Sequence, residues 1–243
     1  MYLSDLHTHT IASGHGTNST ITAMAREASK RGLKLLGITD HGPATLSSAT
    51  DSYFRSLSTA PKRRFDLDLL FGAECSILDE TGKLDLSDEV LSLLDYCIAS
   101  LHPHAKKPEG KEKDTKAVLA ALEHPAVRIL GHLDDTAYVL DYASIIQKCA
   151  QKNVILEMNE ASLCPGSYRG DTKENASEML RLCATYQLPI LLSSDSHGPE
   201  GVGEFPYAER FVHESLFPEK LILNNQLPRL RMLLSLRPPY VLS

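Results

Sequence analysis

The sequence predicts an α/β protein in which seven parallel strands close into a somewhat irregular barrel. Apolar, often β-branched runs recur at intervals of roughly 30 residues, with helix-like segments between most of them. In addition, residue types that bind metals follow directly after most of these runs. Because such residues on the first and last strands have to meet at one site, closure is favoured over an open, doubly wound sheet.

The elements follow from the apolar pattern of each segment. Strands are expected at 2–6, 33–39, 67–73, 96–101, 127–131, 154–158 and 190–193. Helices are expected to begin at Ser19, with apolar positions at Ile21, Ala25 and Ala28, and to lie near 116–122, 142–150, 175–185 and 207–215. The alternation is regular enough to predict βα units rather than separate helical and sheet regions.

One domain covering 1–243 is expected, because 42% apolar and 23% charged residues in 243 allow a single large core. Neither end carries a signal-like segment, and no apolar stretch approaches the roughly 20 residues that span a membrane, so a cytoplasmic protein is expected. The five cysteines are scattered and form no Cys-x-x-Cys pair, which predicts small buried residues rather than disulfides or a thiolate metal site.

Two segments are expected to be loops. Residues 42–61 are rich in Ser, Thr and Ala around Tyr53 and Phe54, and form either a short lid or a mobile surface loop. A second segment carries Lys106, Lys107, Lys111 and Lys113. This charge run is expected to be solvated, although it would also attract an anionic substrate.

Nine residues form a candidate metal-binding set. His7 and His9 alternate along a strand end, so both rings face the same side and can hold one ion. His15 follows in a loop whose glycines allow the chain to fold back over the site. The remaining candidates are His41, Glu74, His102, His132, Asp195 and His197. Imidazole and carboxylate ligands suit zinc, manganese or iron rather than calcium, and nine are too many for one tetrahedral ion.

With these residues in order, the chain resembles the PHP domain (polymerase and histidinol phosphatase) family, and within it the YcdX-type phosphatases. The resemblance runs from Leu3 through the helix after Pro228, and all nine ligand positions match. It implies a distorted, TIM-like barrel of seven strands with three divalent metal ions, zinc being preferred over manganese or iron. It also implies how the ligands divide. The first ion would take His7, His9, Glu74 and Asp195; the second Glu74, His102 and His132; the third His15, His41 and His197.

The implied chemistry is hydrolysis by metal-activated hydroxide. Two ions that share the carboxylate of Glu74 would lower the pKa of a water, and a third would polarise a phosphoryl oxygen. Glu74 and Asp195 are therefore expected to be essential for catalysis. Arg169 is expected to hold the phosphate through its planar guanidinium, with a solvent-facing position as the alternative. No serine or cysteine nucleophile motif and no Walker-type loop occurs in the sequence.

Residues near the ligands have weaker predictions. Asp5 and Asp40 would either accept a proton from a ligating imidazole or make a local turn hydrogen bond. His104, His124 and His213 fall outside the ligand pattern and are expected to be structural or surface residues.

These observations predict a metal-dependent phosphomonoesterase that acts on small phosphorylated metabolites. Three alternatives stay open: a PHP-type exonuclease or phosphodiesterase acting on nucleic acid, a histidinol phosphatase, and a metal-binding scaffold without activity. A net charge of −6 and the lack of a basic stripe with interleaved aromatic residues make nucleic acid a less favoured substrate. The intact ligand set argues against a scaffold. The pattern does not predict the leaving group or the oligomeric state.

Overall fold

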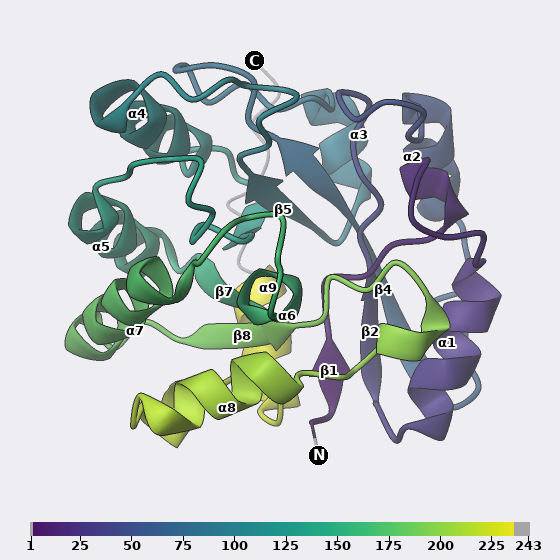
Figure 1. Ribbon diagram of the computed structural model, residues 1–243. Helices are drawn as coiled ribbons and strands as arrows, with labels where there is room; N and C mark the ends of the chain where they lie inside the picture. The colour runs from purple at the N-terminus through teal and green to yellow at the C-terminus, as the bar shows by residue number, and fades with distance from the viewer. Residues whose placement is uncertain (1, 236–243) are drawn as a thin grey trace.

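A computed structural model describes residues 2–235 and shows a nearly closed barrel surrounded by helices (Figure 1). Met1 and 236–243 of the predicted domain lie outside the described residues. Seven parallel strands follow one another in the order β1-β2-β4-β5-β6-β7-β8. They are β1 (Ser4–Asp5), β2 (Leu35–Ile38), β4 (Leu67–Ser76), β5 (Tyr96–Ser100), β6 (Val127–Leu130), β7 (Ile155–Asn159) and β8 (Ile190–Ser193). The predicted seven-stranded barrel is confirmed. One short strand was not predicted, β3 (Arg63–Arg64), which pairs antiparallel with β4.

The helices lie around the barrel between successive strands, as βα units require. They are α1 (Ile21–Lys30), α2 (Asp51–Leu57), α3 (Asp88–Leu93), α4 (Lys111–Ala121), α5 (Tyr142–Lys152), α6 (Glu160–Leu163), α7 (Lys173–Tyr186), α8 (Pro206–Glu214) and α9 (Leu227–Ser235). Side-chain caps fix several starts: Thr20 accepts from the amide of Ala23 at α1, and Asp141 from that of Ser144 at α5.

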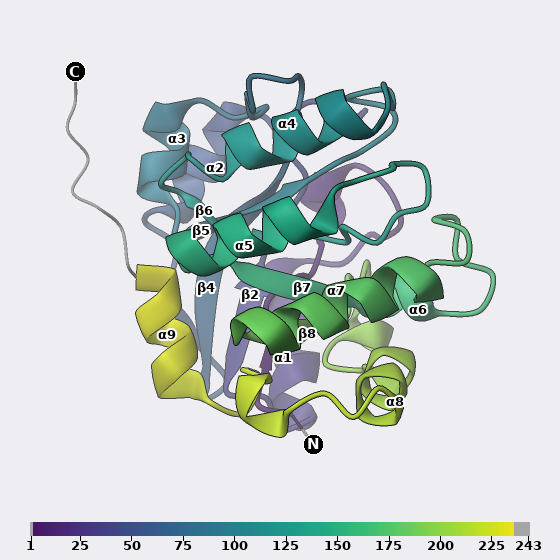
Figure 2. The same ribbon diagram turned by 90° about the vertical axis from the view of Figure 1, so that its left-hand side faces the viewer.

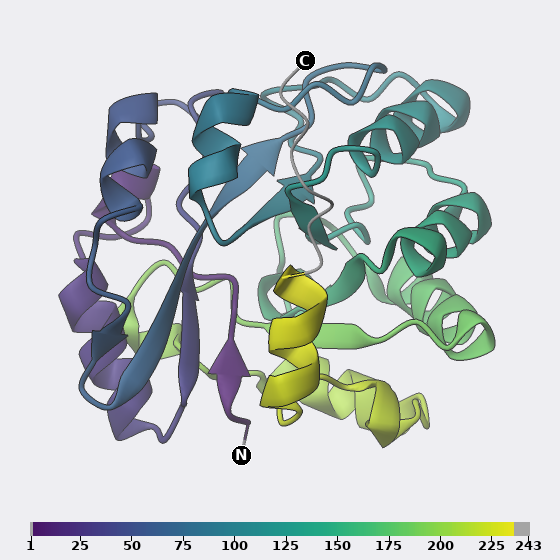
Figure 3. The same cartoon turned by 180° about the vertical axis from the view of Figure 1, so that it is seen from behind.

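Buried hydrophobic side chains on the inner faces of the strands fill the barrel interior. Leu35, Tyr96, Ile129 and Leu191 belong to this buried cluster. Leu230, Leu233 and Leu234 of α9 pack against the same cluster, so α9 covers one end of the barrel. In Figure 2, α9 lies on the left, whereas α6, which directly follows β7, lies on the right; in Figure 3, which shows the molecule from behind, α9 (yellow) faces the viewer. The other end is left for the loops that follow the strands.

The first and last strands meet along a seam that is held mainly by side chains. The only backbone ladder contact there is the bridge between Thr8 and Ser196, beyond the ends of β1 and β8, within the described residues. Asn224 supplies the rest: its Oδ1 accepts from the amide of Leu192 at 2.9 Å, and its Nδ2 donates to the carbonyls of Ser4 at 3.0 Å and Leu192 at 2.8 Å. One buried amide side chain therefore replaces several ladder hydrogen bonds.

Three details differ from the sequence-based expectations. Segment 42–61 is not a loop throughout, because residues 51–57 form α2, in which Phe54 is fully buried. Lys106 is not solvated: it is 3% exposed, and its Nζ donates to Asp114 at 2.6 Å. Cys164 is exposed, whereas the other four cysteines are buried as expected. Within residues 2–235, no helix has the length and apolar character needed to cross a membrane.

Candidate metal centre

The nine candidate ligands lie at the same end of the barrel, because each one ends or follows a strand. His7 and His9 follow β1, His41 follows β2, and Glu74 lies near the end of β4. The others follow β5, β6 and β8: His102, His132, Asp195 and His197. His15 lies just after a short 3₁₀ turn, Ile11–Ser13, that returns toward His9. Parallel strands thus bring residues from the whole length of the chain to one mouth.

The carboxylate of Glu74, which is 1% exposed, lies at the centre of this set. Its Oε1 is 2.7 Å from Nε2 of His132 and 3.2 Å from Nε2 of His102. Its Oε2 is 2.8 Å from Nδ1 of His41 and 3.3 Å from Nε2 of His7. The two oxygens therefore face different imidazole groups, as a bridging carboxylate requires.

Asp195 is the second buried carboxylate of the site, and it contacts two of the histidines as well as Arg169. Its Oδ1 is 3.1 Å from Nε2 of His9 and 3.6 Å from Nε2 of His7. Its Oδ2 accepts from Nη2 of Arg169 at 2.9 Å and from Nδ2 of Asn159 at 3.2 Å. Asp195 has a positive φ of 53°, a conformation that turns the chain sharply after β8.

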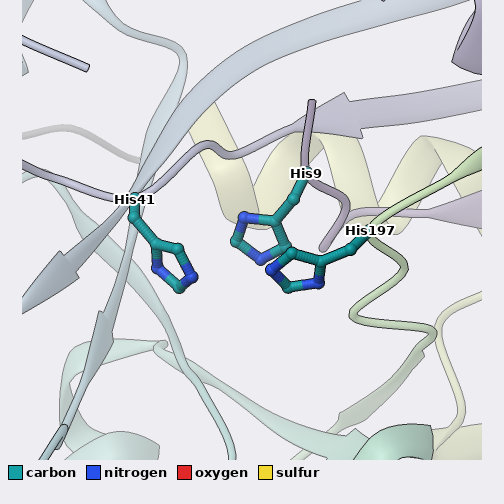
Figure 4. Close-up of side chains that lie close together, drawn as sticks. All are labelled: His9, His41 and His197. Atoms are coloured by element: carbon teal, nitrogen blue, oxygen red, sulfur yellow. The ribbon is translucent and has the colours of Figure 1, made fainter. Parts of the chain in front are cut away.

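His15, His41 and His197 gather on the solvent side of the cluster. The ring centroid of His15 lies 5.0 Å from that of His41 and 4.9 Å from that of His197. His9 also faces this group, with its ring 4.1 Å from His197 and 4.3 Å from His41 (Figure 4). The ligand atoms of His9, His41 and His197 come close enough to hold one ion, as do those of His7, His9 and Asp195. His9 therefore lies between two groups that the resemblance keeps apart.

Five of the rings are oriented by a contact at Nδ1. Nδ1 of His7 lies 2.7 Å from Oε1 of Glu157. Nδ1 of His9 lies 2.9 Å from Oγ of Ser13, and Nδ1 of His102 lies 2.9 Å from Oγ of Ser76. Nδ1 of His15 and Nδ1 of His197 each lie 3.1 Å from a backbone carbonyl oxygen, that of Ser13 and that of Asp195 respectively. An acceptor at Nδ1 places the proton there and leaves the Nε2 lone pair free for a metal.

The donor atoms fit a group of divalent cations. Nε2 of His7, His9 and His197 and Oε2 of Glu74 are buried without a hydrogen-bond partner among the described residues. Buried polar atoms of this kind are costly unless something satisfies them. Because all of them are nitrogen or carboxylate oxygen atoms that face one centre, bound zinc, manganese or iron would satisfy them together.

The electrostatics of the cluster favour the ligand forms of both carboxylates. Burial opposes ionisation of Glu74, but His7 and His41 hold its pKa well below the usual range. Burial likewise opposes ionisation of Asp195, and His7 and Arg169 hold its pKa well below the usual range. Burial, together with His41, lowers the pKa of His9 well below its ordinary value, so this ring is neutral near pH 7. Anionic carboxylates and a neutral imidazole are the forms that bind metals.

A cavity of about 610 Å³ opens onto this cluster. His15, His102 and Asp195 line it together with Arg169, which is 3% exposed and donates to Asn159, Ser162 and Asp195. The solvent-facing alternative for Arg169 is therefore wrong.

Asp5 and Asp40 do not contact an imidazole. Asp5 accepts from the amides of Ser194 at 3.2 Å and Gly203 at 2.8 Å, and so reinforces the seam. Asp40 accepts from Ser13 Oγ at 2.7 Å, and Ser13 in turn contacts His9. Asp40 thus reaches a ligand through one hydroxyl group.

The three other histidines behave in two ways. His124 and His213 lie away from the centre, near Asp88 and Glu209 respectively, as expected. His104 is exposed, but it lines the cavity and stacks on His102 with ring centroids 5.2 Å apart.

Sequence reasoning missed four residues that orient the site: Glu157, Asn159, Ser13 and Ser76. Glu157 had a detectable signal, since it is the one charged residue in the otherwise apolar run 154–158. A carboxylate at an inward position of a buried strand requires a partner, and here the partner is His7, one of the candidate ligands.

Comparisons with known proteins give a consistent result. The family model described as PHP domain matches residues 5–161. A protein of Clostridium botulinum named "Probable phosphatase" is 37% identical over 225 residues, which cover 93% of this chain and 91% of that protein. A protein of Thermoanaerobacter with the same description is 36% identical over 228 residues, 93% of this chain and 92% of that protein. Among solved structures, the histidinol phosphate phosphatase of Lactococcus lactis, crystallised with zinc, L-histidinol and phosphate, has a TM-score of 0.58 at 18% identity, covering 89% of this chain and 95% of that one.

Proposed function

We propose that this chain, which belongs to the PHP domain family, is a metal-dependent hydrolase of phosphoric esters that acts on phosphomonoesters of small metabolites. The curated relatives that cover nine tenths of its length are named as phosphatases. The family and the metal-ligand chemistry of the site support hydrolysis, whereas the choice of monoesters and of three ions goes further and rests on the geometry of this chain.

One observation carries the proposal: a buried guanidinium lies next to the histidine and carboxylate cluster in the lining of the cavity. It belongs to Arg169, the one arginine among the described residues that line this cavity. Arg169 places a planar cation beside Asp195 in the lining of this cavity. A phosphoryl group in this cavity would contact both the cluster and the guanidinium. Cations around the equatorial oxygens provide the electrostatic stabilisation that dominates phosphoryl transfer.

The nine ligands support a centre of three ions. Glu74 has its two oxygens on different imidazole groups, so it would bridge two ions, with His7, His9 and Asp195 on one side and His102 and His132 on the other. His15, His41 and His197 would hold the third. Bound divalent cations supply a nucleophile at neutral pH and neutralise charge on the phosphoryl oxygens. The Lactococcus lactis enzyme contains zinc, which supports zinc as the preferred ion here.

The protein residues have separate roles in this proposal. Glu157, Ser13 and Ser76 hold imidazole rings in the orientation that leaves Nε2 free. Arg169 binds the oxygens of the phosphoryl group and fixes Asp195. The cavity, at about 610 Å³, accepts a molecule of metabolite size.

A hydrolysis screen on one metal-reconstituted preparation tests the proposal. Phosphomonoesters, including histidinol phosphate, would be compared with phosphodiesters and single-stranded DNA. We expect release of phosphate from monoesters and little cleavage of the other two classes. Cleavage of DNA or diesters at a higher kcat/KM than any monoester would replace the proposal by a nuclease, and no cleavage at all with full metal content would favour a scaffold.

A further inference from the structure

The cavity beside the metal centre changes character between its floor and its rim. The floor is polar and includes His102, Arg169 and Asp195. The rim carries Leu46 and Tyr168, whose side chains are 88% and 81% exposed. Of the large hydrophobic side chains in residues 2–235, only Leu216, at 89%, is more exposed than these two. Two of the three most exposed hydrophobic side chains therefore stand at one opening.

Tyr168 owes its exposure to a fixed backbone rather than to a loose loop. The carbonyl of Arg169 accepts from Thr136, from its amide at 3.2 Å and from its hydroxyl at 2.6 Å. Gly170, with a φ of +84°, lets this contact form, since a Cβ there would lie 2.4 Å from Oγ1 of Thr136. The guanidinium of Arg169 lies against the tyrosine ring, with Cζ 4.7 Å from its centroid. The ring is thus supported on one side and open to solvent on the other.

We propose that Tyr168, with Leu46, selects the leaving group, so that phosphomonoesters carrying a flat aromatic ring bind best. This inference rests on the proposed phosphatase function and names its substrate class. Exposed hydrophobic side chains that line one cavity, rather than being scattered singly over the surface, are typical of a ligand-binding site. An aromatic ring is the ligand that gains most from the open face of a tyrosine, through stacking as well as area burial.

The short distance between the two anchors limits where that ring can be. Arg169 and Tyr168 are consecutive residues in contact, and Arg169 is the proposed phosphate anchor. A substrate with its phosphoryl group on the floor therefore brings only the atoms next to the ester oxygen over Tyr168. The ring has to be attached close to that oxygen, as in an aryl ester or an ester of a short-chain alcohol that ends in a ring.

Two non-hydrolysable ligands test this selection by binding alone. Calorimetry on the zinc-loaded full chain would compare phenylphosphonate with methylphosphonate, which share the anionic group and differ in the ring. We expect about two- to tenfold tighter binding of phenylphosphonate. Tyr168→Ala should bring the ratio of the two affinities close to one, and Tyr168→Phe should preserve it. Tyr186→Ala, which changes a partly exposed tyrosine that is not among the cavity-lining residues, should leave the ratio unaltered.

The contrary results are separable from failure of the proposed function. Methylphosphonate binding with no preference for phenylphosphonate, or an unchanged preference in Tyr168→Ala, would overturn the role of the rim and leave the phosphatase proposal standing. A wild-type protein that binds neither phosphonate and hydrolyses no monoester would refute the phosphatase proposal, and the selection by Tyr168 would be rejected with it.

Discussion

Arg169 and Asp195 form a buried ion pair in the lining of the cavity, and it extends to the candidate metal ligands. Nη2 of Arg169 donates to Oδ2 of Asp195 at 2.9 Å, while Oδ1 of the same carboxylate lies 3.1 Å from Nε2 of His9. The side chains are 3% and 4% exposed, so little water screens the pair. In the proposed function, this one guanidinium would both fix Asp195 and bind the substrate.

Removing this guanidinium should reduce catalysis without emptying the centre. Arg169→Ala is expected to lower kcat/KM by about ten- to a hundredfold, because a bidentate charged contact is lost. Product inhibition by phosphate should weaken in parallel, and metal content should stay that of wild type. Arg169→Lys should recover only part of the loss, since an ammonium lacks the planar fork. Wild-type kcat/KM and phosphate inhibition in Arg169→Ala would assign the residue a purely structural role.

The number of bound ions follows from the ligand set. The nine candidate ligands divide into sets of four, three and three when Glu74 is counted twice. Sets of three or four protein ligands each suit one transition-metal ion, so the chain should hold close to three ions. Elemental analysis after mild purification and metal reconstitution measures this directly. A value of one ion per chain under metal-replete conditions would contradict the bridging position of Glu74.

Loss of either buried carboxylate should abolish hydrolysis while the barrel stays folded. In both variants the remaining histidines still bind some metal, but Glu74→Ala removes the proposed shared anion and Asp195→Ala removes an anionic ligand beside His7 and His9. Steady-state rates and metal content would be measured together, with circular dichroism to check the fold. Glu214→Ala, an exposed carboxylate on α8, is the matched control and should behave as wild type. Full turnover in either buried variant would eliminate that carboxylate from the catalytic set.

Glu157 should tune metal affinity through His7. Glu157 accepts with both oxygens, Oε1 from Nδ1 of His7 and Oε2 from the amide of His132 and Nδ2 of Asn159. Glu157→Gln keeps the shape but has a single, uncharged acceptor oxygen for these donors, so metal affinity should fall by about ten- to a hundredfold. A chelator competition titration with zinc would measure the change. Glu160→Gln, three residues later and bonded to the amides of Tyr207 and Ala208, is the control. Equal zinc affinities for Glu157→Gln and wild type would show that His7 needs no such partner.

Asp85 should make stability depend on pH in a defined direction. Burial raises its pKa from 3.8 to about 6, although it accepts from the amides of Ala44 and Ser76. The native state therefore binds more protons than the unfolded chain between these values. The stabilisation from this group is complete below about pH 4 and is lost as the pH rises through about 6.

The variant Asp85→Asn isolates this effect. Asparagine does not ionise, so its free energy of unfolding relative to wild type should rise between pH 4 and pH 7, by up to about 3 kcal/mol. Any cost of the lost acceptor is the same at both pH values and cancels in the comparison. Denaturant unfolding of both proteins in the presence of a chelator gives the two differences. A difference independent of pH would mean that Asp85 titrates normally in the folded protein.

The strands could be predicted from their apolar runs, and most of the candidate ligands were identified because they come directly after such a run or near its end. Glu157 could not be placed, because it lies within β7 rather than after it, and its partner His7 is 150 residues away. Ser13 and Ser76 carry no signal, since serine is common in loops and strands alike. Their roles depend on which imidazole the fold brings beside them.

Local structure was harder to predict where charge or polarity dominates. The strand Arg63–Arg64 has no apolar pattern and exists only because it pairs with β4. Lys106 belongs to a basic segment that looks solvated, yet Asp114 eight positions later folds back to bury it. Composition describes the average surroundings of a residue, whereas one well-placed partner decides the burial of a single charge.

The seam between β1 and β8 also determines when, during synthesis of the chain, the candidate metal centre can form. Asp5 and Ser194, which meet across it, are 189 residues apart, and His7 and His9 lie on one side while Asp195 and His197 lie on the other. A nascent chain that has emerged only as far as β7 already carries most of the imidazoles but has neither Asp195 nor the wall it forms. Translation must pass β8 before the proposed bridged centre can assemble, because Asp195 follows that strand. Metal binding by the complete candidate set should therefore require synthesis of β8, and fragments that end before β8 should be unable to hydrolyse phosphate esters.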